Sequence, residues 1–236
     1  MRLIGLIGGM SWESTVPYYR IINETVRERL GPLRSAEILL YSVDFGPIER
    51  LQHEGRWDEA GSTLGAAARR LASAGAECLV LCTNTMHKVA PQIAAHAEIP
   101  LLHIADPTGA AATSRGARTV GLLGTRFTME EDFYRRRLEQ RHGLEVLVPE
   151  SGERDEIHRI IYEELCAGRL DERSRNVFRA VMTRLAQRGA QAIILGCTEI
   201  TLLVGDGDSP VPILDTTRLH ALAAADFALQ PDSRGA

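Results

Sequence analysis

The chain has 236 residues, of which 25% are charged, and its formal net charge is −4. This length suits one large or two small domains, each with a buried core. The weak negative charge gives no electrostatic case for binding nucleic acid or an anionic membrane surface. No apolar run is long enough to span a membrane and no signal-peptide cleavage site is visible, so we expect a cytoplasmic protein.

Short apolar runs alternate with amphipathic segments along the chain. The runs predict strands at Leu3–Ile7, Ile38–Val43, Cys78–Leu81, Leu101–Ile104, Thr119–Leu123, Leu144–Val148, Ala192–Leu195 and Val211–Leu214. The amphipathic segments predict helices at Ser14–Leu30, Trp57–Ser73, Met129–Arg141, Glu153–Ala167 and Arg173–Arg188. Because the apolar runs do not alternate with polar residues, they are typical of parallel strands buried on both faces. The order predicts an α/β protein with open, flavodoxin-like sheets covered by helices.

The chain also contains an internal repeat with an offset of about 114 residues. The matching segments are Arg70–Leu81 with Arg184–Leu195, Gly5–Gly8 with Gly121–Gly124, and Ile99–Leu102 with Val211–Leu214. Three matches in the same order predict two pseudo-symmetric lobes. We expect residues 1–103 together with 209–236 to form lobe one, and residues 104–208 to form lobe two.

Two cysteines, Cys82 and Cys197, occupy equivalent positions in the repeat, each just after a predicted strand. Open α/β sheets bind ligands at the carboxyl ends of their strands, so we expect the two thiols to face one interdomain cleft. The helix starts predicted after each cysteine would bind a carboxylate and lower the thiol pKa. Two acid/base groups on opposite faces of one carbon can remove a proton from one face and return it on the other. The pattern therefore predicts racemisation or epimerisation.

Two loops are further candidates for the ligand site. Gly8–Trp12 follows the first strand, and Gly124–Thr128 is its equivalent in the repeat. The first loop lacks the G-x-G-x-x-G spacing of a dinucleotide site. A purely structural turn and a ligand-binding loop both remain open interpretations.

The other cysteines and the histidines are weaker candidates. Cys78 is expected to pack inside a strand, and Cys166 to lie on a helix surface or in lobe packing. His87 and His158 are possible site residues, whereas surface positions are expected for His53, His96, His142 and His220. No spacing is typical of metal ligands, so we expect no metal.

Three motifs resemble one family: Gly8-Gly9-Met10-Ser11-Trp12, Cys82-Thr83-Asn84-Thr85-Met86-His87 and Gly196-Cys197-Thr198-Glu199-Ile200. They are similar to the aspartate/glutamate/hydantoin racemase superfamily, in its branch of aspartate and broad-specificity bacterial amino-acid racemases. The resemblance implies a two-lobed fold, a homodimer, an amino-acid substrate, no pyridoxal phosphate or other cofactor, and a two-cysteine acid/base pair. The substrate-binding residues that it implies are Met10, Gln52, Thr83, Asn84, Thr85, Thr125, Thr198 and Glu199.

The sequence departs from the narrow aspartate racemases at two places. Their Asp-Arg pair after the second strand is absent from Ser42–Pro47, and Cys166 stands where they carry a lysine. Both changes remove a cation that would hold a side-chain carboxylate. We therefore expect a range of amino-acid substrates that is broader than aspartate or different from it.

Three alternatives stay open. A decarboxylase of the same superfamily needs only one of the cysteines, and a dicarboxylate cis–trans isomerase would keep both. A non-catalytic two-lobed binding protein would need neither.

Overall fold

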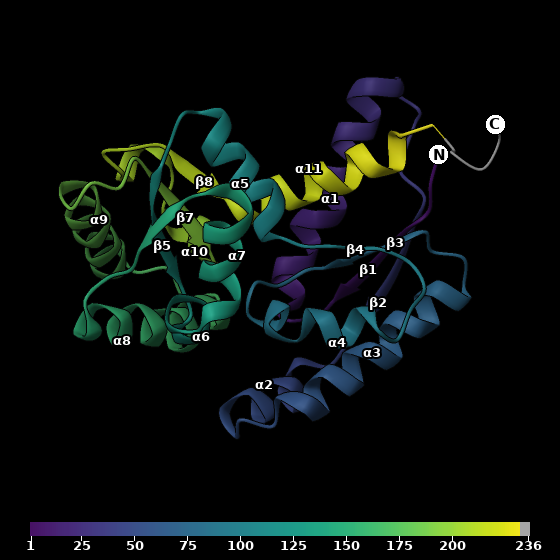
Figure 1. Ribbon diagram of the computed structural model, residues 1–236, viewed down its shortest axis with the longest axis horizontal. Helices are drawn as coiled ribbons and strands as arrows, with labels where there is room; N and C mark the ends of the chain where they lie inside the picture. Colours follow the sequence, from purple (N-terminus) through teal and green to yellow (C-terminus); the bar gives the residue numbers. More distant parts are fainter. Residues whose placement is uncertain (232–236) are drawn as a thin grey trace. The chain divides into compact units, whose positions relative to one another are not determined.

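The computed structural model describes residues 1–231, which form two α/β units (Figure 1). Unit 1 comprises Met1–His103 together with the chain from His220, and unit 2 comprises Ile104–Leu219. Each unit contains a four-stranded parallel sheet, with strand orders β2-β1-β3-β4 and β6-β5-β7-β8. The predicted fold class is therefore confirmed, and the two identical strand orders are those expected of an internal repeat.

Unit 1 builds its sheet from β1 (Ile4–Gly8), β2 (Ile38–Ser42), β3 (Cys78–Leu81) and β4 (Leu101–Leu102). Its helices are α1 (Trp12–Leu30), α2 (Phe45–His53), α3 (Trp57–Ser73), the 3₁₀ helix η1 (Thr85–Val89), α4 (Ala90–Ala94) and α11 (Thr216–Leu229). The first residues of α11 belong to unit 2, so this helix carries the chain from one unit to the other.

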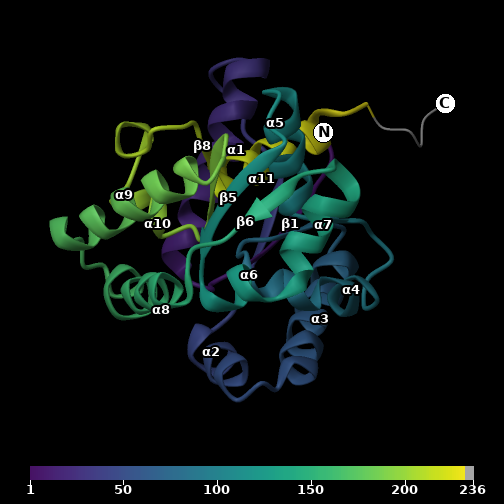
Figure 2. The ribbon, with the colours of Figure 1, turned by 60° about the vertical axis from the view of Figure 1, so that its left-hand side comes forward.

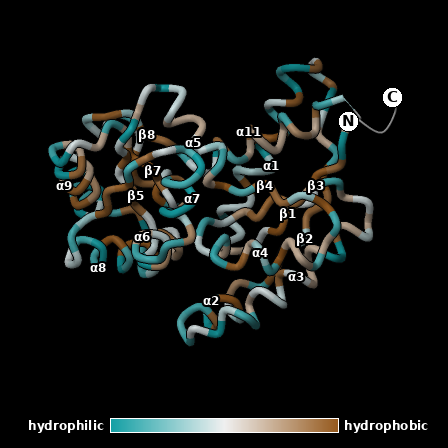
Figure 3. Tube along the Cα trace, in the orientation of Figure 1, coloured by the Kyte–Doolittle hydropathy of each residue, from teal (hydrophilic) through white to brown (hydrophobic). Residues whose placement is uncertain are grey.

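Helices cover both faces of the first sheet (Figure 1). On one face Leu79 and Leu81 pack with apolar residues of α3 such as Leu64. On the other face Val80 and Cys82 pack with α1 and with the alanines of α11. The central strands β1 and β3 are buried along their whole length, which explains their uninterrupted apolar sequences (Figure 3).

Unit 2 builds its sheet from β5 (Thr119–Gly124), β6 (Glu145–Leu147), β7 (Ala192–Gly196) and β8 (Ile213–Asp215). Its helices are α5 (Ala105–Ser114), α6 (Arg126–Glu130), α7 (Asp132–His142), α8 (Ser151–Arg159), the π-helix η2 (Ile160–Glu164), the 3₁₀ helix η3 (Leu165–Ala167), α9 (Glu172–Gln187), α10 (Ile200–Leu203) and the 3₁₀ helix η4 (Asp206–Asp208). In Figure 2, β5 and β6 can be followed side by side, in agreement with their parallel pairing.

The second sheet also lies between two helical layers. Ile193 and Leu195 of β7 pack with Phe178 of α9 and with apolar residues of α8 and η2. On the opposite face Ile194 packs with Tyr134 of α7 and with α5. The two faces thus alternate along β7, as they do along β3.

The last strand lies in a different unit from the one we expected. We assigned the chain from residue 209 to lobe one, but β8 pairs with β7, and unit 2 continues to Leu219. The repeat explains this placement, because Val211–Leu214 matches Ile99–Leu102, and β4 occupies the same place beside β3. No helix within residues 1–231 is long and apolar enough to cross a membrane.

Candidate active site

Cys82 and Cys197 follow equivalent strands in the two units. Cys82 comes directly after β3, and its backbone N–H donates to Ile7 O of β1 at 2.9 Å. Cys197 comes directly after β7, whose Gly196 is in register with Gly124 at the end of β5. Each cysteine therefore lies at the carboxyl end of an inner strand of its sheet, β3 in unit 1 and β7 in unit 2. Open α/β sheets bind ligands at this end of their strands.

The first glycine loop has a structural cause. Gly9 has φ +91°, and a Cβ atom there would collide with the carbonyl oxygen of Val43. Its N–H donates to Thr15 Oγ1 of α1 at 2.9 Å, and Ser11 caps that helix by accepting from the N–H of Ser14. Backbone geometry and packing therefore explain why Gly9 is a glycine, without reference to a ligand.

The Cys82 thiol lies in an apolar layer. Its side chain is fully buried with Ile4, Val80 and residues of α1 and α11, and it donates weakly to Val80 O at 3.8 Å. Burial raises the pKa of the Cys82 thiol far above its ordinary value. Our expectation of a lowered pKa for Cys82 is therefore wrong, because its thiol is completely removed from water.

The residues after Cys82 form a buried turn. Thr83, Asn84 and Thr85 are all buried, and Thr85 begins the 3₁₀ helix η1. His87 Nδ1 forms a hydrogen bond with Thr83 O at 2.8 Å, and the His87 N–H donates to Asn84 O at 3.0 Å. His87 thus fixes the backbone of the turn that carries the first motif.

Met10 and Gln52 lie in the apolar layer on the α3 side of the first sheet. Gln52 is buried at the end of α2, and its Nε2 donates to Met86 Sδ at 2.9 Å. Met10 and Met86 belong to the same apolar cluster. The structure brings these three side chains together, whereas the Cys82 side chain lies in the layer on the other face. The family resemblance implied Met10 and Gln52 as site residues, and it gave no indication of the contact between Gln52 and Met86.

Cys197 has a charged neighbour within its own motif. Its thiol donates to Glu199 Oε2 at 3.0 Å, and Thr198 Oγ1 donates to the same oxygen at 2.7 Å. Burial, followed by the charges of Glu199 and Cys166, raises the pKa of Cys197 well above its ordinary value. Here too the lowered pKa that we expected from the helix start is absent, and α10 after the motif is only four residues long.

Most of the chain, including both cysteine motifs, matches the model of one protein family. The model of the Asp/Glu/Hydantoin racemase family aligns with residues 7–224. This chain belongs to the Asp/Glu/Hydantoin racemase family.

Solved structures and a curated relative agree with this assignment. A Yersinia pestis protein assigned to the Asp/Glu racemases is 56% identical, with a TM-score of 0.92, and the match covers 98% of this chain and 100% of that one. An aspartate racemase homologue from Pyrococcus horikoshii OT3 is 35% identical, with a TM-score of 0.84 and the same coverage. The broad specificity amino-acid racemase RacX of Bacillus subtilis is 22% identical over 223 residues, which cover 91% of this chain and 93% of RacX.

The racemase-family fold places the remaining candidates of unit 2 as follows. Thr125 caps α6, and its Oγ1 accepts from Thr128 N at 3.3 Å. His158 accepts from the N–H of Arg126 at Nδ1, at 3.2 Å, so it lies beside the Thr125 loop. Cys166 is half-buried and packs against the apolar cluster that contains Cys197. Cys78 is buried inside β3, as expected of a packing residue.

Sequence reasoning missed a buried group of histidines in unit 1. His220 is not at the surface, because it bonds Tyr18 Oη through Nδ1 at 2.9 Å and Leu102 O through Nε2 at 2.8 Å. The His87 ring lies 4.5 Å from the His103 ring and 5.7 Å from the His220 ring, centroid to centroid. These residues are far apart in the sequence, so only the topology of the sheet could have brought them together.

Proposed function

We propose that the protein is a cofactor-independent amino-acid racemase in which Cys82 and Cys197 form the acid/base pair at Cα. One observation carries the proposal: in a chain of this family, a thiol follows the equivalent strand in each of two sheets with the same strand order. A racemase needs two such groups, since one removes the α-proton and the other supplies its replacement.

The buried thiols fit such a reaction in one respect. Thiols with raised pKa values stay protonated in the free protein, and their thiolates are strong bases once formed. The ammonium group of an amino acid would supply the positive charge that stabilises a thiolate in apolar surroundings. Substrate binding would thus favour the charged form that proton abstraction requires.

For the substrate side chain we propose a range wider than aspartate. By the family resemblance, Cys166 replaces the lysine of narrow aspartate racemases, and the amide of Gln52 donates a hydrogen bond to the sulfur of Met86. Neither group provides a cation for a second carboxylate. The substrate contacts that we propose are Met10, Gln52, Thr83, Asn84, Thr85, Thr125, Thr198 and Glu199, with a homodimer as the assembled form.

The test is a panel of single-enantiomer amino acids followed by circular dichroism. We expect the signal of at least one enantiomer to decay to zero, and uncharged amino acids to be inverted at least as fast as aspartate and glutamate. Decay for no amino acid would contradict the racemase. Product formation from a dicarboxylate without inversion of an amino acid would indicate the isomerase or the decarboxylase instead.

A further inference from the structure

Cys166 is a thiol that the proposed reaction does not use, and it lies in the same apolar cluster as Cys197. It belongs to η3 and packs against the buried residues of unit 2, which include Cys197, Leu165 and Ile200. Helix α10, which follows the Cys197 motif directly, contacts η3. Both thiols therefore lie in one cluster of one unit, close to the contact between these two short helices.

The charges of the two thiols also interact. Burial and the carboxylate of Glu199 raise the pKa of Cys197 most, and a negative charge on Cys166 raises it further. The interaction between two charges weakens as their separation grows, so this effect agrees with the packing of both thiols in one cluster. Both are free thiols and are available for oxidation.

The four cysteines differ in their access to water. Cys78, Cys82 and Cys197 are buried, whereas Cys166 is half-buried. The chain turns outward directly after it, because η3 ends at Gly168 with φ +71° and the residues that follow are exposed. Oxidation of a thiol depends on its exposure to the oxidant. A small oxidant therefore reaches Cys166 more easily than it reaches the other three thiols.

We propose that Cys166 is an oxidation site, which hydrogen peroxide converts into a disulfide with Cys197. In the first step the Cys166 sulfur attacks a peroxide oxygen, so that an S–O bond forms, the O–O bond breaks and a water leaves with the thiol proton. In the second step the Cys197 sulfur attacks the sulfenic acid, so that the S–S bond forms, the S–O bond breaks and a second water leaves. The two thiols together lose two electrons, and the peroxide gains them.

The order of the two steps follows from the surroundings of each sulfur. Cys197 has a raised pKa and stays a thiol, which reacts slowly with a dilute oxidant. A sulfenic acid on Cys166, in the same cluster, is held at a high effective concentration instead. The disulfide removes the acid/base thiol of unit 2. This effect on activity rests on the proposed function, whereas the disulfide itself forms without it.

The experiment follows the cross-link and the activity in the same samples. Wild-type protein is treated with hydrogen peroxide, the remaining thiols are alkylated with iodoacetamide, and unreduced peptides are mapped by mass spectrometry. We expect one cross-linked pair, Cys166 with Cys197, and a loss of racemisation of at least about 10-fold, because an acid/base group is blocked. Dithiothreitol should restore the activity to within about twofold, since thiol exchange opens the disulfide.

Two variants test whether Cys166 is required, each compared with its own untreated sample. Cys166→Ser should give no cross-link to Cys197 and should lose the inactivation that dithiothreitol reverses. Cys78→Ala, which removes a buried thiol of unit 1, should form the cross-link and lose activity as wild type does. If Cys166→Ser does not fold, Cys166→Ala places an apolar side chain in the cluster and serves in its place.

The outcomes separate this inference from the racemase. If wild type racemises no amino acid, the proposed function fails, and the peptide map alone decides whether the disulfide forms. A treated wild-type protein without the cross-link between Cys166 and Cys197 would overturn the inference, even if Cys166 were oxidised irreversibly. Reversible inactivation of Cys166→Ser to the same extent as wild type would overturn it as well.

Discussion

At the scale of single residues, burial governs the ionisation of the cysteines. Cys78 lies inside β3, and burial, together with the charge of Glu77, raises the pKa of its thiol to about 12. An acid whose pKa is raised by folding stays neutral in the native state at a pH where the unfolded chain already ionises. The contribution of the Cys78 thiol to the free energy of unfolding is complete below its pKa in the unfolded chain, near 9. It is lost as the pH rises toward 12.

This gives a pH-dependent prediction for Cys78. Between about pH 9 and pH 12, the Cys78 thiol should make the free energy of unfolding fall by about 1.4 kcal/mol per pH unit. Urea denaturation at several alkaline pH values should show a shallower decline for Cys78→Ala than for wild type. Parallel declines would contradict a thiol held neutral by the fold.

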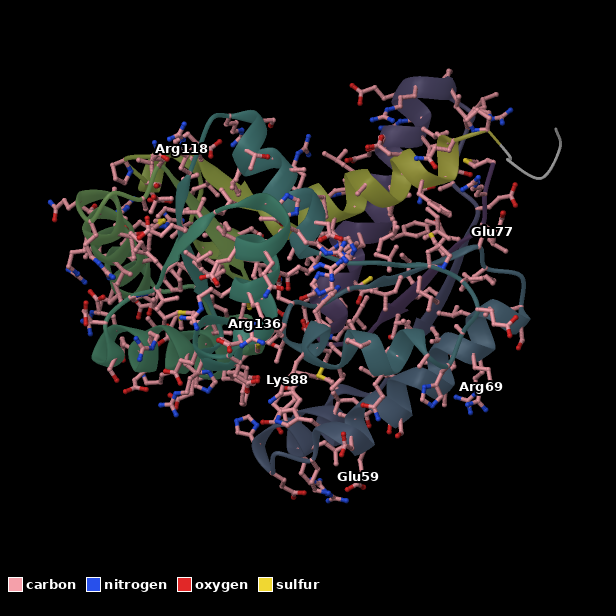
Figure 4. The ribbon with its side chains drawn as sticks, in the orientation of Figure 1. Glu59, Arg69, Glu77, Lys88, Arg118 and Arg136 are labelled. Atoms are coloured by element: carbon pink, nitrogen blue, oxygen red, sulfur yellow. The ribbon has the colours of Figure 1, made fainter. Side chains whose placement is uncertain are left out.

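Lys88 is the lysine of this chain, and it is occupied by an aromatic contact (labelled in Figure 4). Its Nζ lies 3.8 Å from the centroid of the Trp57 ring, and arginine can make the same cation–π contact. We expect Lys88→Arg to keep racemase activity within about threefold, because no step of the proposed reaction uses a lysine side chain. A protein that loses all activity with this substitution would require a lysine in the chemistry.

At the scale of elements, tight turns connect the strands to the helices that follow them. Gly9 combines a positive φ with a backbone contact that leaves no room for a side chain. Gly31, after α1, has φ +112°, but a Cβ atom added at this position would have no atom within 4 Å. A side chain at Gly9 would meet both backbone strain and steric crowding, whereas a side chain at Gly31 would meet backbone strain alone.

We expect Gly9→Ala to lower the free energy of unfolding by about 2 kcal/mol more than Gly31→Ala does. Both substitutions force an L-residue into positive φ, which costs about 1 kcal/mol, and the first adds a collision with Val43 O. Thermal or urea unfolding of the two variants measures the difference. Equal losses would mean that the loop adjusts to the added methyl group.

Helices α1 and α11 are joined to β4 through a buried polar contact. Tyr18 Oη forms a hydrogen bond with His220 Nδ1, and His220 Nε2 forms a second one with Leu102 O. Tyr18→Phe should cost about 1–3 kcal/mol, because the imidazole nitrogen is left without this partner in a buried site. The neighbouring Tyr19→Phe, at an exposed ring, should cost less than about 0.5 kcal/mol. Similar values for the two variants would contradict the structural role of the contact.

Periodicity identified most elements, and the missed ones have a physical cause. The strands and long helices carry continuous apolar or amphipathic patterns, which is why their positions were predictable. Helix α5 was missed because its residues are mostly alanine, glycine and threonine, which give little amphipathic contrast. The predicted helix over Met129–Arg141 divides at Glu131, whose extended backbone (ψ 149°) separates α6 from α7.

Within the candidate site, the sequence located the two cysteine motifs after their strands, but it did not predict the contacts of their side chains. The repeat placed Cys82 and Cys197 on equivalent strands, since strand ends are encoded locally. The Gln52–Met86 contact joins two different helices, and the Glu199–Cys197 contact depends on a side-chain direction that the motif does not specify. The expected lowering of the thiol pKa failed because helix starts were visible in the sequence, whereas complete burial was not.

At the scale of the whole molecule, each of the two units supplies one thiol to the proposed reaction. The duplication gives each unit a sheet of the same order with a cysteine after the same strand. A reaction that used one thiol would not require the second cysteine at the equivalent position of the other unit. The proposed function therefore requires that both thiols act on the same Cα.

The most direct test is racemisation of a single enantiomer in heavy water, with inversion and deuterium incorporation followed together. Wild type and Cys78→Ala should invert the substrate and place deuterium in the product from the first turnovers. Cys82→Ser and Cys197→Ser should each lose inversion in both directions by about 100-fold or more, while retaining exchange only of the enantiomer served by the remaining thiol. Inversion by either serine variant at close to the wild-type rate would contradict the two-thiol account.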